Sequence, residues 1–202
     1  WVWELMHAWD SAFADRWAPT LSFGFLTLTA YPDPHPETTT VDGWVVRSVP
    51  QESWAALIAG VGTAVATDTD ISAVFFQMAC GGTSPLFIQL QRSIFLFDTS
   101  SLGATVTISA AVLSLYGISK YDGLTAAPNL DIYTSTPASN TVLANADYTQ
   151  IGAVSQTGAP LSYASYSTTG YNDCTFNGTG RGNVSLTSIS KFGVRNANYD
   201  VA

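Results

Sequence analysis

Few residues in this chain could perform chemistry, and they are far apart. The chain has two histidines, His7 and His35, and it contains no G-x-S-x-G sequence. Hydrolysis by a serine or cysteine nucleophile needs a histidine base held rigidly beside it. His7 falls in a predicted helix and His35 in a proline-rich arm, and both are poor supports for such a pair. We therefore predict that the protein is not an enzyme.

Pairs of carboxylates offer a second route to catalysis. Glycoside hydrolysis places two carboxyl groups at a fixed separation on either side of the scissile bond. The chain has three glutamates and twelve aspartates, and their spacing does not single out two that would face each other. A small polysaccharide-active enzyme is therefore the last of the three functions that we consider.

The strongest candidate for a metal site is Asp68-Thr-Asp70, because two carboxylates on one loop can bind a hard cation. It is not an EF-hand, since Ala73 stands where the turn glycine belongs and Ala79 where the bidentate glutamate belongs. Two interpretations stay open: a calcium site completed by other loops, or a solvated loop between strands. We predict that no cofactor is required and that calcium is the one candidate ion.

The two cysteines, Cys80 and Cys174, lie in distant segments and form no C-x-x-C motif. With only two histidines beside them, they provide no ligand set for structural zinc. A disulfide between them depends on a Cα separation that a sequence does not contain. Two separate, partly buried thiols are the plainer interpretation.

Three tyrosines, Tyr163, Tyr166 and Tyr171, fall in a segment rich in serine, glycine and threonine. Such a segment can present aromatic rings to solvent, where they stack on sugar faces and their hydroxyls serve as polar handles. Ordinary packing of alternating tyrosines on a sheet is the competing interpretation. These three residues are the candidate carbohydrate-binding residues.

The composition limits the classes of partner. Charged residues make up 11% of the chain and its formal net charge is −8. Binding to a phosphate backbone needs clustered lysine and arginine, which this sequence lacks, so we expect no nucleic-acid partner. The apolar residues 21–30 are too few to span a bilayer, so we expect no membrane span. They could instead end a signal peptide, but the acidic segment before them favours a structural role.

The N-terminal part is predicted to differ from the rest. Val2, Leu5, Met6, Trp9 and Phe13 recur at helical spacing, which predicts an amphipathic helix over residues 1–17. Alternating prolines at 32, 34 and 36 then predict a stiff, extended arm. We expect residues 1–36 to form this helix and arm, and residues 37–202 to form one domain.

The remainder consists mostly of short runs of branched and aromatic residues separated by glycine, proline, asparagine and serine. The predicted strands are 41–48, 71–79, 87–98, 104–117, 129–135, 171–177, 183–190 and 191–195. A short helix is expected at 49–59, begun by a capping box at Ser48 and Gln51 and stopped by Gly60. This order predicts an all-β fold, a sandwich or a barrel.

Four local patterns add detail to this prediction. Residues 94–97 are apolar without alternation, so that strand is expected to be covered on both faces. Within 104–117 the apolar phase slips by one residue after Ile108, which predicts a β-bulge in one continuous strand. Asp98 is expected to accept backbone N–H bonds in the turn that follows it, and residues 178–182 are expected to form a hairpin tip.

The segment from Arg92 through IFLFD-TSS-L to Leu115 resembles the DNRLRE-type β-sandwich domains. The similarity continues loosely through residues 171–176 and 191–195. Residues 31–90 are also similar to uncharacterised proteins from metagenomes and phage-associated contigs. The resemblance implies a jelly-roll-like antiparallel β-sandwich, in a family of secreted, surface and fibrous proteins with some members classed as carbohydrate-binding modules.

The function expected first is a non-enzymatic extracellular structural or adhesive module, a subunit of a fibre, cell surface or virion appendage. A carbohydrate-binding module stabilised by calcium is the second. The family's usual final strand is not recognisable here, so one sheet edge is expected to need a filler. We hypothesise that residues 21–30, from the same chain or from a neighbouring subunit, pair at that edge.

Overall fold

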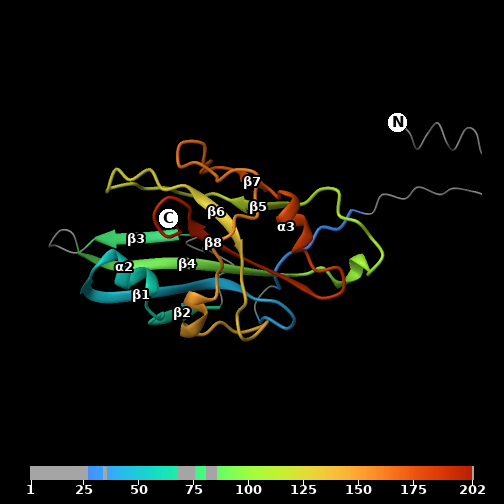
Figure 1. Cartoon of the computed structure of the whole chain (residues 1–202), viewed down its shortest axis with the longest axis horizontal. Coiled ribbons are helices and arrows are strands. Elements are labelled where there is room, and N and C mark those ends of the chain that lie inside the picture. Colours follow the sequence, from blue (N-terminus) through green and yellow to red (C-terminus); the bar gives the residue numbers. More distant parts are fainter. Residues whose placement is uncertain (1–26, 34–35, 68–75, 81–85, 202) are drawn as a thin grey trace, which may run out of the picture.

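The computed structural model describes residues 27–33, 36–67, 76–80 and 86–201 (Figure 1). The predicted helix over residues 1–17 and most of the segment 21–30 lie outside these residues. The elements are β1 Asp42–Glu52, α2 Trp54–Ala59, β2 Ala64–Ala66, β3 Phe76–Cys80, β4 Phe87–Asp98, η1 Ser100–Leu102, β5 Val112–Tyr116, β6 Leu130–Thr134, η2 Asn145–Thr149, β7 Tyr171–Thr175, α3 Gly178–Gly182 and β8 Ile189–Asn196. None of the helices in the described part is long and apolar enough to cross a membrane.

The strands form two antiparallel sheets. The larger has the order β2-β1-β4-β8-β6, and β3 pairs with the first half of β4 on the side that β8 occupies along its second half. The smaller consists of β5 and β7 (Figure 1). The prediction of an all-β fold with antiparallel sheets and few short helices is therefore confirmed. The jelly-roll connectivity and the division at residue 36 stay predictions.

Strand β4 is the centre of the hydrophobic core, and both of its faces are covered. Ile94 and Leu96 are fully buried in a cluster with Leu57 of α2 and Tyr148 of η2. Phe95 faces the other way, into a second cluster that joins the β5–β7 sheet to the larger sheet. The lack of alternation in this apolar run thus reflects burial on both sides, as predicted.

The predicted bulged strand over residues 104–117 is wrong in its first half. Gly103 has a φ of 82°, a conformation that favours glycine, and residues 104–111 form turns and irregular chain. The ladder between β5 and β7 begins only where the Phe176 N–H donates to the Ala111 carbonyl at 2.9 Å. A strand needs a partner, and beyond this bond the partner chain turns into α3.

The expected hairpin tip at residues 178–182 is also wrong, because these residues form the short helix α3. Asn177 caps it, since its side-chain oxygen accepts the Gly180 N–H at 2.9 Å. A Cβ atom on Gly180 would lie 2.1 Å from the Gln156 carbonyl oxygen, so the tight packing here requires glycine. Residues 183–188 are likewise not a strand, and β8 starts at Ile189.

The helix expected at 49–59 is shorter than predicted. Strand β1 continues to Glu52, and the cap is Ser53 rather than Ser48, with its hydroxyl accepting the Ala56 N–H at 3.3 Å. Its end at Gly60 is as predicted. The Ser48–Gln51 pattern was misleading because this segment belongs to β1, which pairs with β4 at Ser48 and again, after a shift in register, at Glu52.

The open side of β6 is covered by residues 150–161 of the same chain. The N–H groups of Gly152, Gln156 and Leu161 donate to three carbonyls of β6, at 2.8, 2.8 and 2.7 Å. This edge of the larger sheet is therefore completed within one chain. Residues 27–30 form no strand, and residues 21–26 of the proposed filler lie outside the described residues.

A buried ion cluster joins the central strands to the end of the chain. Arg92 of β4 and Arg195 of β8 both bind the carboxylate of Asp200, whose side chain is completely buried. The last turn of the chain, red in Figure 1, folds back toward α2, where Trp54 Nε1 donates to the Tyr199 carbonyl at 2.8 Å. Asp200 thereby gives a single negative charge to two buried arginines.

Replacing Asp200 tests how strongly this cluster stabilises the fold. Asp200→Asn keeps the size of the side chain but leaves two buried guanidinium groups without a counter-charge. We expect the free energy of unfolding at pH 7, measured by urea denaturation, to fall by about 3–5 kcal/mol. The matched control is Glu52→Gln, which breaks the more exposed Arg47–Glu52 pair and should cost about 1 kcal/mol or less.

The free energy of unfolding of wild type and that of Asp200→Asn should depend differently on pH. Burial by itself raises the pKa of Asp200, but the hydrogen bonds from Arg92 and Arg195 outweigh it and hold the pKa below its ordinary value. Such a group stabilises the fold above the unfolded pKa of about 3.9, and this contribution is lost as the pH falls through the lower folded pKa. The stability gap between wild type and Asp200→Asn should therefore be constant at neutral pH and narrow below about pH 4. A gap that widens on acidification would contradict this assignment.

Candidate functional site

The two strands of the smaller sheet alternate between buried and exposed residues, and they place one tyrosine each on the exposed side. Leu113 and Leu115 of β5 point into the core, as the sequence predicted. The outward residues form three facing pairs, Val112–Thr175, Ser114–Asp173 and Tyr116–Tyr171. We call these six residues the β5–β7 face.

Tyr116 and Tyr171 form an exposed aromatic pair at one end of this face. Their exposed fractions are 50% and 68%. The ring centroids are 5.1 Å apart and the planes are at 84°, an edge-to-face contact. One ring thus supports the other while both remain open to a ligand.

A polar pair lies next to these rings on the same two strands. The Ser114 hydroxyl donates to Asp173 Oδ1 at 2.6 Å, and both residues are exposed. Aromatic surface beside a hydroxyl and a carboxylate can bind a molecule that has both an apolar face and polar groups, as a sugar ring has.

The other two candidate tyrosines, Tyr163 and Tyr166, lie in the loop before β7 and are only partly exposed. Burial raises the pKa of Tyr166. Its ring lies against Gly117, where a Cβ atom would come 3.0 Å from the ring and 1.9 Å from the Ser167 carbonyl oxygen. Of the three tyrosines named from the sequence, Tyr171 alone lies on the exposed face, and the other two shape the loop beside it.

Lys120 ties this loop to the one that follows β5. Its ammonium donates to the carbonyls of Tyr163, Ala164 and Tyr166 at 2.8, 3.3 and 2.9 Å. It also lies 5.0 Å from the centre of the Tyr163 ring, within the range of a cation–π contact. Sequence reasoning missed Lys120, because nothing in the chain marks which carbonyls an isolated lysine will meet.

Exposed apolar residues continue from the β5–β7 face onto the loop after β5. Tyr121 is 91% exposed, Ile118 is 63% exposed and Leu124 is 41% exposed. Sequence reasoning also missed Tyr116 and Tyr121. The alternation in VLSLY would have placed Tyr116 outward, opposite to the leucines, whereas the loop residue Tyr121 had no such signal.

The described aspartates are mostly occupied by backbone groups. Asp147 accepts N–H bonds from Ala138 and Ala144, and Asp98 accepts one from Ser100, the last as predicted. Asp33 binds the N–H groups of residues 38 to 40 and two of their hydroxyls, and the Thr38 hydroxyl bond contributes most to a pKa far below the usual value.

Asp68, Asp70 and both histidines lie outside the described residues. Within the residues described, no three His, Cys, Asp or Glu side chains are grouped so as to hold a metal ion. Cys174 is a free, buried thiol on the inner side of β7. Burial raises its pKa to about 11, so it is a poor nucleophile at neutral pH.

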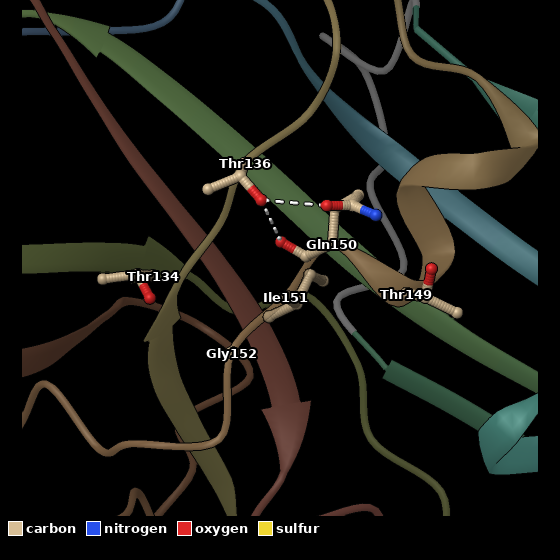
Figure 2. A pocket seen from close by; sticks show the side chains of 6 residues that line it. All are labelled: Thr134, Thr136, Thr149, Gln150, Ile151 and Gly152. Atoms are coloured by element: carbon tan, nitrogen blue, oxygen red, sulfur yellow. Dashed lines mark hydrogen bonds between the residues drawn. The ribbon is translucent and has the colours of Figure 1, made fainter.

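A shallow pocket lies at the end of β6, away from the β5–β7 face. Figure 2 shows its lining, which consists of Thr134, Thr136, Thr149, Gln150, Ile151 and Gly152. Thr136 Oγ1 lies 3.0 Å from Gln150 Oε1 and 3.4 Å from the Gln150 carbonyl oxygen. The volume of the pocket, about 190 Å³, is small for a ligand site, and no side chain that lines the pocket can titrate.

Comparisons with family models, with curated proteins and with solved structures found no match to this chain. The resemblance to DNRLRE-type domains therefore stays a prediction, and the case for a function depends on the geometry of the β5–β7 face.

Removing the Lys120 ammonium should loosen the neighbouring loop without unfolding the sheets. In Lys120→Met three carbonyls lose their shared donor, so we expect the amides of residues 163–167 to exchange with deuterium faster than in wild type. Hydrogen exchange followed by mass spectrometry measures this. Lys191→Met on β8 is the matched control, and unchanged exchange in residues 163–167 of Lys120→Met would show that the ammonium does not hold the loop.

Proposed function

We propose that this chain is a non-enzymatic extracellular module, structural or adhesive, that contacts its partner through the β5–β7 face. The place we propose for it is outside a cell, on a cell surface or on a virion. The low content of charged residues, 11%, supports this setting as a compositional tendency.

One observation carries the proposal: the large exposed apolar side chains are concentrated in one region. Six of the twelve that the described residues expose belong to the β5–β7 face and the loop after β5. They are Val112, Tyr116, Ile118, Tyr121, Leu124 and Tyr171. A gathering of exposed apolar side chains in one part of a fold is typical of an interaction site, whereas scattered single residues are not. Tyrosine is also enriched at protein interfaces.

A carbohydrate-binding module is the second candidate, and the Ser114–Asp173 pair favours it. This pair offers a hydroxyl and a carboxylate beside two exposed rings, which matches the mixed polarity of a sugar. In this second candidate calcium would stabilise the module, and Asp68 and Asp70 are the residues proposed to bind the ion. A polysaccharide-active enzyme gains less support, because Asp33, Asp98 and Asp147 accept backbone hydrogen bonds and Asp200 is bound by arginines.

Replacing the exposed aromatic pair separates these functions. In Tyr116→Ser with Tyr171→Ser, we expect the fold to persist, since both rings are at least half exposed and their mutual contact is worth only about 1 kcal/mol. If the module is adhesive between copies, self-association measured by sedimentation over a range of concentrations should weaken by about tenfold or more. If the module binds glycans, the double variant should lose glycan binding that wild type shows on an array probed with and without calcium.

The control is Tyr31→Ser, because Tyr31 is 75% exposed but belongs to the N-terminal arm. It should change neither measurement. A wild-type protein that stays monomeric at all concentrations would overturn self-association through this face, and one that binds no glycan would overturn the second candidate. Equal effects of the Tyr31 and Tyr116–Tyr171 variants would remove the β5–β7 face from the proposal.

A further inference from the structure

The cluster around Asp200 has the geometry of a receptor for a carboxylate. Arg92 directs Nε and Nη2 at the two carboxylate oxygens, with Nε 2.8 Å from Oδ2. Arg195 directs its own Nε and Nη2 at the same two oxygens, each at 3.0 Å. Two planar forks therefore hold one planar anion, a pattern of charge-assisted bonds that favours carboxylates.

The two arginines are fixed by groups other than Asp200. Arg92 Nη1 donates to the Tyr148 carbonyl at 2.7 Å, and its guanidinium lies 4.0 Å from the centre of the Tyr148 ring. Arg195 Nη1 donates to the carbonyls of Ile151 and Gly152 at 3.2 and 3.0 Å. These bonds would keep both guanidinium groups in place without the carboxylate.

The turn that carries Asp200 is likewise held by its other residues. The Ala197 N–H donates to the Asn129 carbonyl at 2.8 Å. Asn196 Oδ1 accepts the N–H groups of Asn198 and Tyr199 at 2.8 and 3.2 Å. The Asp200 side chain is thus inserted into the arginine site from a turn that is attached independently, and its removal would vacate the site without detaching the turn.

We propose that Arg92 and Arg195 form a carboxylate-binding site whose resident ligand is Asp200, and that the site takes a small monocarboxylate when that side chain is absent. The site contains two positive charges, each at most 10% exposed, against a single carboxylate. An empty site would leave two like charges buried together, so binding of an anion is strongly favoured. This inference is independent of the proposed function.

Chemical rescue of Asp200→Gly in the full chain tests the site. The probe is sodium formate, compared with sodium chloride at equal ionic strength, and the readout is the thermal unfolding midpoint. Because a ligand that binds only the folded state stabilises it, formate should raise the midpoint of Asp200→Gly by roughly 3 °C or more. The wild-type midpoint should be equal in the two salts, since Asp200 already fills the site.

Two further variants make the result specific. Asp200→Gly with Arg195→Met lacks one fork and should lose the formate effect, and Asp200→Asn fills the site with an amide and should show none. If Asp200→Gly is unfolded in chloride, recovery of its circular dichroism spectrum in formate supports the site. Equal behaviour of Asp200→Gly in both salts, folded or unfolded, overturns the proposal, as does an equal gain in wild type.

Discussion

The layers on one face of the larger sheet meet at one buried ion cluster, in which a single carboxylate neutralises two arginines on neighbouring central strands. Arg92 and Arg195 project from the same face of the larger sheet, and without Asp200 their charges would repel each other in a region from which water is excluded. Their remaining N–H groups satisfy carbonyls at the end of α2, in η2 and in the segment after it. One ion cluster therefore links the central strands to α2, to η2 and to the segment after η2.

The sequence predicted the fold best where a segment's environment is simple. The bounds of β4 and its two covered faces followed from an apolar run without alternation, and Leu113 and Leu115 followed from strict alternation. The errors arose where a tertiary partner decides the conformation. Residues 104–111 have strand composition but no partner strand in the described part, and residues 178–182 form a helix because Asn177 caps them.

The candidate site was only partly predictable for the same reason. Tyr171 was named from composition, but its exposure depends on the pairing with Tyr116, and the burial of Tyr166 depends on a close approach to Gly117. The buried ion pair of Arg92 was not predicted from the sequence. Its partner lies 108 positions away, a distance over which a single sequence carries no pairing information.

The covering of β6 by residues 150–161 makes that margin of the larger sheet different from its other margins. Three carbonyls of β6 on that margin already accept hydrogen bonds, so a strand from another molecule could not pair with them there. If copies of this protein join strand to strand, addition at β6 is blocked. Strand-to-strand joining would then have to use the other margins. A margin paired with its own copy gives a closed dimer, and only two different margins paired head to tail could give an extended fibre.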